Sequence, residues 1–211
     1  MIRAVIFDMD GVLIDSEIVY LRHQKKKLEK NYPWIRESDL YPLVGMDNNE
    51  DKYFMADLLG RDAEDPAFLQ ELNEIYSGVE VSYPEIMRPA VPSLLQSLKE
   101  RGHKVALASS SHMDNILEVL TSCKIRNFFD CIVSGEQFAH SKPDPEIYFH
   151  VMKTLGVQPK ESLIVEDSTY GVTAGRRAGA HVIALRDDRF CFDQSLADYR
   201  IRSLEEVLQY V

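Results

Sequence analysis

The sequence predicts an α/β protein: a doubly wound, Rossmann-like parallel sheet with an inserted all-helical cap. Short, continuously apolar segments recur along the chain, and amphipathic helical patterns lie between them. Continuous apolarity is typical of parallel strands that are covered on both faces. The stretch 16–85 breaks this rhythm, because it contains helical patterns and no convincing strand. We therefore expect a core domain of residues 1–15 and 86–211 and a helical cap of residues 16–85.

Five segments have the length and composition of buried strands: residues 4–7, 105–108, 131–133, 163–165 and 182–185. Each of the first four is followed by a small or acidic polar residue. These residues are Asp8, Ser109, Ser134 and Glu166. Ligand sites of open parallel sheets lie outside the carboxyl ends of the strands, so we expect the functional residues at this edge.

Three helical patterns accompany these strands. Apolar residues recur at i, i+3, i+4 and i+7 over residues 91–98, and Gly102 ends this helix. A second helix is expected over residues 144–155, ended by Gly156. The third contains glycines at four-residue spacing, Gly171, Gly175 and Gly179. Each glycine costs a helix about 1 kcal/mol, so we interpret the spacing as one that lets the helix approach the sheet closely.

The cap is expected to contain at least three helices, over residues 16–30, 50–59 and 66–76. Ser16 is a suitable N-cap for the first, and Pro66 stands in the opening turn of the third. A helical insertion directly after the first strand is the simplest interpretation of this region.

Composition excludes several classes of function. The 24 Lys and Arg against 34 Asp and Glu give a net charge of −10, whereas a nucleic-acid backbone or an acidic lipid surface requires a basic face. The three cysteines are too few and too scattered for a disulfide framework. No apolar run reaches the roughly 18 residues of a membrane span. We expect a cytoplasmic protein, a monomer or weak homodimer, that binds neither nucleic acid nor membrane.

Two aspartates at the end of the first strand are the most informative feature. Asp8 and Asp10 lie two residues apart, so their side chains project in the same direction. Gly11 permits a tight turn, and successive backbone N–H groups there can face an anion. Met9, inside this turn, is a candidate contact for such an anion. Two aspartates are usually only a turn, but their place between an apolar strand and Gly-Val-Leu is much more specific.

The other strand ends add complementary groups. Ser109 offers a hydroxyl group, and Glu166 with Asp167 offers two carboxylates. Lys142 is a single cation in Ser-Lys-Pro-Asp-Pro, where two prolines fix the backbone. Each has an ordinary explanation by itself: a helix cap, a solvated lysine and a polar strand exit. These polar residues occur in order after successive predicted strands, and this arrangement indicates that they form one site.

Four motifs, residues 7–16, 106–111, 141–145 and 164–168, together with the glycine-rich stretch 171–179, resemble the haloacid dehalogenase superfamily. The resemblance is to the branch that contains β-phosphoglucomutase and small-molecule phosphatases, and it covers nearly the whole chain. It implies that Asp8 attacks phosphorus and forms an aspartyl-phosphate. Asp10 would protonate the leaving oxygen and then take a proton from water. Ser109 and Lys142 would hold the phosphoryl oxygens.

The charges of these residues predict that the site binds a divalent cation. The four carboxylates would surround a substrate that is itself an anion, and two like charges about 4 Å apart cost roughly 4 kcal/mol at an effective dielectric of 20. All-oxygen ligands favour Mg²⁺ over zinc. By resemblance, the ligands are the Asp8 side chain, the Asp10 backbone carbonyl and Asp167. Glu166 is expected to support them rather than to bind the ion.

We expect the cap to determine which substrate the protein accepts. In mutases of this branch, a histidine after the first motif and an arginine in the cap loop accompany a second phosphate, and the corresponding positions here are Tyr20 and Asn48. The loop 45–50 has no basic residue before Lys52. Because an arginine fork suits a second phosphate, its absence favours a phosphohydrolase of a small metabolite, such as a sugar phosphate, over β-phosphoglucomutase.

Residues 46–49 with Tyr20, and Ser16 at the start of the cap, are our candidates for substrate contact. Dehalogenation would not need Asp10. Phosphonate cleavage would need a cap lysine, and Lys52 is better explained as an exposed helical residue. A non-catalytic binding module is opposed by the intact motifs. The apolar stretch 190–192 is either an oligomer contact or packed core.

Overall fold

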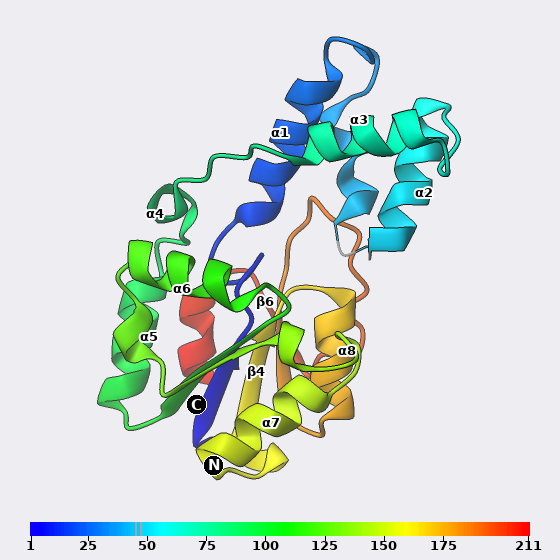
Figure 1. The fold of residues 1–211 in the computed structure, drawn as a ribbon. Coiled ribbons are helices and arrows are strands. Elements are labelled where there is room, and N and C mark those ends of the chain that lie inside the picture. The colour runs from blue at the N-terminus through cyan, green and yellow to red at the C-terminus, as the bar shows by residue number, and fades with distance from the viewer. Residues whose placement is uncertain (45, 47) are drawn as a thin grey trace. The chain divides into compact units, whose positions relative to one another are not determined.

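The computed structural model describes residues 1–44, 46 and 48–211, and for residues 48–50 the backbone alone. In these residues six strands form one fully parallel sheet, in the order β3-β2-β1-β4-β5-β6 (Figure 1). They are β1 (Ala4–Phe7), β2 (Lys104–Ser109), β3 (Cys131–Ser134), β4 (Ser162–Glu166), β5 (His181–Leu185) and β6 (Tyr199–Ile201). This confirms the doubly wound α/β prediction. The order reverses at β1, where a ligand crevice is expected.

The sixth strand was not predicted. β6 comprises three residues, and Tyr199 and Arg200 are exposed while only Ile201 is buried. It pairs with β5 at the edge of the sheet. A strand of this length offers neither a continuous apolar run nor enough residues for an alternating pattern, so the sequence carries no signal for it.

Helices cover both faces of the sheet. They are α5 (Val91–Glu100), α6 (Met113–Ser122), α7 (Glu146–Leu155) and α8 (Thr169–Arg177), and the short helix α4 (Tyr83–Ile86) contacts α6. Figure 1 shows α7 and α8 on one side of the strands and α5 and α6 on the other. Short 3₁₀ helices occupy several loops, at Arg126–Phe128, Gly135–Gln137, Pro159–Glu161 and Leu204–Gln209.

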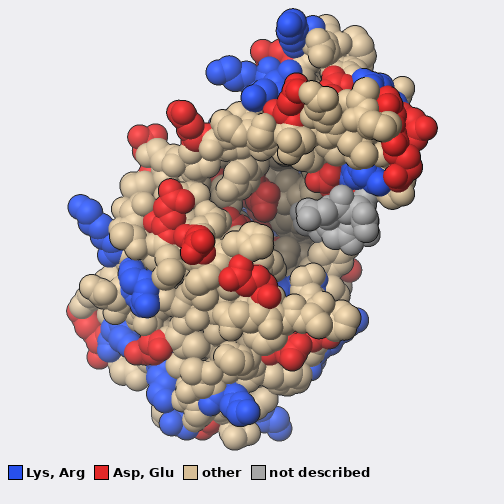
Figure 2. Space-filling view, in the orientation of Figure 1, with Lys and Arg blue, Asp and Glu red and all other residues tan. Residues whose placement is uncertain are grey.

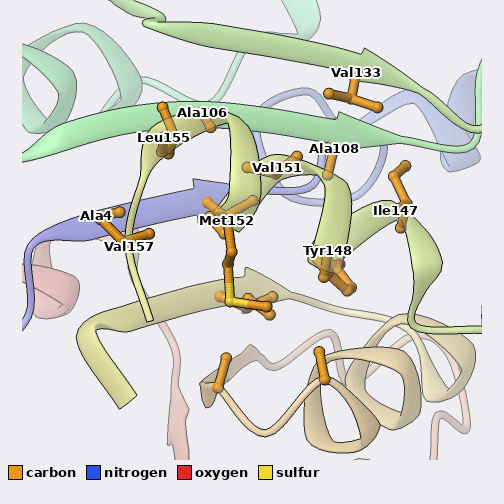
Figure 3. Packing of buried hydrophobic residues seen from close by; sticks show 14 of the residues in the cluster. Ala4, Ala106, Ala108, Val133, Ile147, Tyr148, Val151, Met152, Leu155 and Val157 are labelled. Carbon is orange, nitrogen blue, oxygen red and sulfur yellow. The ribbon is translucent and has the colours of Figure 1, made fainter. Parts of the chain in front are cut away.

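The core under α7 brings one functional side chain to the sheet. The buried residues of this helix recur at helical spacing, and they pack on the alanines of β1 and β2 (Figure 3). Small alanines at these strand positions let the helix lie close. Tyr148 is fully buried in this layer, so its hydroxyl must find a partner inside the protein.

In the α/β unit, α7 and α8 differ from the prediction. α7 begins at Glu146 rather than at residue 144, because the Asp144 side chain accepts the Glu146 N–H at 2.9 Å and Pro145 precedes the first turn. Its end is as expected, with Gly156 in the left-handed conformation. In α8 only Gly171 and Gly175 lie within the helix. Gly179 follows it at φ +76, where it serves the turn instead.

The chain divides into two compact units. The α/β unit comprises Met1–Asp15, Tyr83–Asp188 and Phe192–Val211, and the helical unit comprises Ser16–Ser82 with Arg189–Cys191. The inclusion of the last segment was not anticipated. Phe190 is buried there, and its ring meets the edge of Tyr41 at 5.6 Å between centroids. This apolar residue is therefore packed core, whereas Cys191 is exposed.

The helical unit contains α1 (Ser16–Leu28), α2 (Asn48–Leu59) and α3 (Pro66–Tyr76), with 3₁₀ helices at Glu37–Asp39 and Tyr41–Leu43. The prediction for α3 is confirmed, and Asp65 caps it by accepting the Ala67 N–H. α1 ends two residues earlier than predicted and α2 begins two residues earlier. No helix among the described residues is long and apolar enough to cross a membrane.

Candidate active site

The turn after β1 presents the first acidic residue. Asp8 extends the strand by donating its N–H to the Val165 carbonyl at 3.0 Å. Gly11 follows at φ +76, and a Cβ there would overlap the carboxylate of Asp167. Glycine is thus required at position 11, because its φ angle is positive and because a side chain there would collide with Asp167. Arg88 donates to the Gly11 carbonyl through Nε at 3.1 Å and its terminal nitrogen at 2.7 Å, which fixes the turn.

Lys142 lies at the centre of the site. Its side chain is only 6% exposed, and its ammonium donates to Asp8 Oδ1 at 2.5 Å and to Glu166 Oε1 at 2.6 Å. The third donor reaches the Ala108 carbonyl at 3.0 Å. All three N–H bonds of the ammonium are therefore used within the protein. The ring of Tyr148, 5.2 Å away, adds a cation–π contact.

Glu166 is held by four donors. Oε1 accepts from Lys142 and from the Tyr148 hydroxyl at 2.7 Å. Oε2 accepts the Asp167 N–H at 3.1 Å and the Ser168 hydroxyl at 3.2 Å. The start of α8 lies directly on this carboxylate, because a Cβ at Gly171 would overlap it. These four bonds match the roughly four acceptor sites of a carboxylate.

Burial changes the ionisation of this group of residues. It raises the pKa of Asp8 to about 8, although Lys142 opposes the shift. The neighbouring Glu166 and Asp10 carboxylates raise the pKa of Asp8 further. Burial also opposes the charge on Lys142, but Asp8 and Glu166 outweigh it and hold the pKa of the ammonium well above its usual value. The site thus holds a protonated lysine among acids that repel one another.

Three buried acids could hold a metal ion. Carboxylate oxygens of Asp8, Glu166 and Asp167 all lie within 4.8 Å of one another. Asp167 is also fixed through its backbone, since the buried Gln194 amide donates to its carbonyl at 2.5 Å and to the Leu185 carbonyl at 2.9 Å. One ammonium stands against three acidic side chains, so a bound cation would favour their ionised forms, including that of Asp8, whose pKa burial raises.

Asp10 is joined to the end of β2 by serines. The Ser111 hydroxyl donates to Asp10 Oδ2 at 2.8 Å, and the Ser111 N–H donates to Ser109 Oγ at 3.1 Å. Ser134, at the end of β3, donates its hydroxyl to the Ser111 carbonyl at 2.7 Å. Because Ser109 and Ser134 are paired in the sheet register, both strand ends support this loop.

The predicted site residues of the α/β unit therefore lie on connected elements. Asp8, Lys142, Glu166 and Asp167 form one buried group, and Asp10 and Ser109 are linked through Ser111. Met9 is different. Its side chain is fully buried, and its carbonyl accepts the N–H groups of Leu13 and Ile14. Only its backbone N–H is left as a phosphate contact.

The predicted substrate contacts of the cap belong to the helical unit. Ser16 is the first residue of α1 and is buried, and Tyr20 is half-buried on the same helix. Asn48 is the first residue of α2, but its side chain lies outside the described residues, as do Gly45 and Asp47 entirely. The substrate roles of these residues stay predictions.

Lys52 differs from the exposed residue that we expected. Its side chain is 19% exposed and its ammonium pairs with Glu64 at 2.6 Å. The same nitrogen lies 4.6 Å from the centre of the Tyr53 ring. The lysine is therefore held in a local contact within the helical unit.

Sequence reasoning missed three residues that hold this site. Tyr148 and Gln194 were not singled out, and Ser111 was only part of a motif. Tyr148 carried a signal, since it lies on the apolar face of the predicted helix 144–155. Gln194 carried none, because it lies in an irregular segment 27 residues beyond the residue whose carbonyl it binds.

Comparisons with known proteins agree with the motifs. The family model described as haloacid dehalogenase-like hydrolase matches residues 5–185, and the chain belongs to this family. A protein named phosphorylated carbohydrates phosphatase, from Thermotoga maritima, is 33% identical over 84% of this chain and 82% of its own length. Hexitol phosphatase B of Escherichia coli is 32% identical over 98% of this chain and 94% of its own length.

A solved structure extends the likeness to the mutases. The β-phosphoglucomutase of Clostridium difficile is 25% identical, with a TM-score of 0.74 over 100% of this chain and 96% of that one. The chain thus resembles phosphatases and a phosphoglucomutase, and the family is an enzyme family of hydrolases.

Proposed function

We propose that the protein is a Mg²⁺-dependent phosphohydrolase that cleaves a small phosphorylated metabolite, such as a sugar phosphate, through an aspartyl-phosphate on Asp8. One observation carries the proposal: Asp8 is a buried carboxylate at the carboxyl end of β1, held by Lys142 beside Glu166 and Asp167. Hydrolases of this family that act on sugar or hexitol phosphates are among its relatives by name.

The first half-reaction transfers the phosphoryl group to the protein. Asp8 Oδ1 accepts from Lys142, so we assign the attack on phosphorus to Oδ2. As the new bond to phosphorus forms, the ester bond breaks and its electron pair goes to the leaving oxygen. Asp10 gives its proton to that oxygen, and the alcohol departs.

The second half-reaction restores Asp8. A water molecule attacks phosphorus and gives a proton to the Asp10 carboxylate. The bond between phosphorus and Asp8 then breaks, and its electron pair returns to the carboxylate. Phosphate leaves, and both aspartates regain their starting protonation. The division into two displacements replaces one difficult step by two easier ones.

Lys142 and Ser109 fit the binding of the phosphoryl group. The Ser109 hydroxyl oxygen accepts the Ser111 N–H, which leaves its own O–H to donate to a phosphoryl oxygen. The three contacts of Lys142 hold the ammonium beside the attacked position, and a phosphoryl oxygen would share this charge with Asp8. Positioning and charge stabilisation are the main needs of phosphoryl transfer.

The acidic group fits Mg²⁺. We assign the ion to the Asp8 and Asp167 side chains and the Asp10 carbonyl, all hard oxygen donors. Glu166 already accepts four hydrogen bonds, which supports an orienting role for it. A bound divalent cation would offset the negative charge of the transferred group. Added Mg²⁺ should raise the melting temperature of the wild-type protein, and a chelator should abolish both this shift and turnover.

The surface agrees with a small substrate. Lys and Arg lie among Asp and Glu on the face of each unit drawn in Figure 2, rather than in a continuous basic area. Free thiols at Cys123, Cys131 and Cys191 support the cytoplasmic, reducing setting that we propose. We keep the prediction that the protein is a monomer or weak homodimer.

The nucleophile assignment has a direct test. Asp8→Asn keeps the size of the side chain but removes its nucleophilic oxygen anion, so release of phosphate from p-nitrophenyl phosphate should fall below detection. Glu118→Gln, the same chemical change at an exposed position on α6, should leave turnover unchanged. Intact-mass measurement of acid-quenched wild-type protein should show one added phosphoryl group, and peptide mapping at acidic pH should locate it on Asp8. A phosphoryl group on another residue would refute the mechanism.

The second candidate is β-phosphoglucomutase, favoured by the likeness to the Clostridium difficile structure. Tyr20 and Asn48 argue against it, since neither supplies positive charge for a second phosphate. The protein is mixed with β-glucose 1-phosphate and a trace of the 1,6-bisphosphate. A phosphatase releases inorganic phosphate, and glucose 6-phosphate without free phosphate would establish the mutase.

A further inference from the structure

Ser111 connects Asp10 to the framework of the α/β unit. Its hydroxyl donates to Asp10 Oδ2 at 2.8 Å, while its own backbone is fixed on both sides. The N–H donates to Ser109 Oγ, and the carbonyl accepts the hydroxyl of Ser134, a fully buried residue. The contact with Asp10 is therefore made by a side chain whose backbone is held by two strand ends.

The usual role of a serine at this place would be a helix cap. α6 begins at Met113 with His112 as its N-cap residue, and no side chain caps it. The Ser111 hydroxyl is directed to Asp10 instead. A carboxyl group rotates easily about its last torsion angle, so one hydrogen bond from a fixed donor restricts its orientation.

We propose that Ser111 is a positioning residue for Asp10, and that Ser134 fixes Ser111 by donating to its carbonyl. Because the Ser111 hydroxyl donates to Oδ2, it fixes the orientation in which the Asp10 carboxyl group meets the leaving oxygen. After the alcohol departs, the same contact stabilises the carboxylate that accepts a proton from water. The inference rests on the proposed role of Asp10 as acid and base.

The orientation of a general acid affects the rate at which it transfers its proton. A positioned general acid contributes about 10²- to 10⁴-fold to a rate, and a misplacement of about 1 Å can cost about 10²-fold. The contribution depends on how basic the leaving oxygen is. p-Nitrophenolate leaves readily without a proton, whereas phenolate, which has nearly the same shape, is a poorer leaving group. A loss confined to the poorer leaving group is thus the signature of a misplaced acid.

The test compares phenyl phosphate with p-nitrophenyl phosphate. The ratio kcat/KM covers the steps up to ester cleavage, so it reports Asp10 as acid and not the later hydrolysis. Ser111→Ala should lower kcat/KM for phenyl phosphate about tenfold or more and for p-nitrophenyl phosphate less than about threefold. Ser134→Ala should show the same pattern more weakly. Ser122→Ala, an exposed serine on α6, serves as the matched control and should change neither.

A double-mutant cycle tests whether Ser111 acts through Asp10 or in another way. In the Asp10→Asn background, Ser111→Ala should cause no further loss of kcat/KM. Inhibition by inorganic phosphate should be unchanged by Ser111→Ala, and thermal unfolding checks that each variant folds. Equal losses on both esters, a weaker inhibition by phosphate, or a full additional loss in the Asp10→Asn background would overturn the proposal.

The outcomes also separate the two proposals. A wild-type protein that hydrolyses neither ester, or an Asp8→Asn variant that stays active, contradicts the proposed function itself. If wild type and Asp8→Asn behave as expected while Ser111→Ala acts equally on both esters, only the role of Ser111 is wrong.

Discussion

Two cations, one in each unit, gather carboxylates in very different surroundings. Lys142 in the α/β unit meets Asp8 and Glu166, and its side chain is 6% exposed. Arg61 in the helical unit meets Glu71 at 2.6 Å and Asp65 at 3.3 Å, and its side chain is 30% exposed. Each cation meets two carboxylates, and the two networks differ most clearly in how far their side chains are buried.

Burial shifts the ionisation of the first network. The pKa of Asp8 is raised to about 8 by burial, against the pull of Lys142. In the second network the pKa of Asp65 is lowered, by the Ala67 N–H and by Arg61, as is usual for a solvated pair. An exposed ion pair contributes little beyond a local contact, whereas strongly shifted pKa values in a buried group of acids are typical of functional sites and agree with the active site that we propose.

The largest expected effect is that of Lys142→Met, which keeps a chain of similar length but removes the charge. Asp8 and Glu166 then lose a shared donor, and activity should fall by about 10³-fold or more. Loss of one partner of a buried pair also costs about 3–5 kcal/mol of stability, measurable by urea unfolding.

Arg61→Met makes the same chemical change in the exposed network. Turnover should stay close to wild type, because the carboxylates left behind are solvated. Similar losses of activity in the two variants would show that burial is not what distinguishes these networks.

The next effect comes from the contact between α8 and Glu166. Gly171→Ala gains about 1 kcal/mol of helix propensity, but its Cβ overlaps a carboxylate held by four donors. Overpacking of this kind costs about 1–3 kcal/mol, and the shifted Glu166 should lower activity. We expect a net destabilisation of about 1 kcal/mol in urea unfolding.

Gly175→Ala on the same helix is the control for this prediction. Its nearest atoms would be methyl groups of Val182 at 2.9 Å and Ile164 at 3.2 Å, so the Cβ meets apolar side chains at a longer distance than the overlap with Glu166 at Gly171. The gain in helix propensity and the small repacking cost should nearly cancel. If both variants lose the same activity, the contact with Glu166 is not the cause.

A smaller effect is expected for Tyr148→Phe. The change removes the 2.7 Å hydrogen bond to Glu166 Oε1 but keeps the packed ring and the Lys142 contact. A hydrogen bond to a charged group contributes about 1.5–3 kcal/mol, so stability should fall by about 1.5 kcal/mol. Activity should fall less than tenfold. Unchanged urea unfolding would show that this bond contributes nothing net.

These residues also show how far the sequence could predict the site. Asp8 and Glu166 were found because apolar strands end beside them, and the parallel topology then brings those ends to one edge. Lys142 lies in the loop after β3 and was found from the two prolines that follow it. Tyr148 and Gln194 reach the same acids through tertiary packing, which depends on how elements distant in sequence meet. The strand β6 was missed for a different reason, since three residues carry no periodic signal.

The smallest effect is expected for Lys52→Ala in the helical unit. A phosphonate-cleaving enzyme would need a cap lysine to form a Schiff base with its substrate, but this ammonium is paired with Glu64 and lies over Tyr53. The pKa of Lys52 is raised by its bond to Glu64, which keeps the amine protonated and therefore not nucleophilic. Turnover of p-nitrophenyl phosphate should be unchanged. Loss of activity together with a borohydride-trapped adduct on Lys52 would instead assign imine chemistry to this unit.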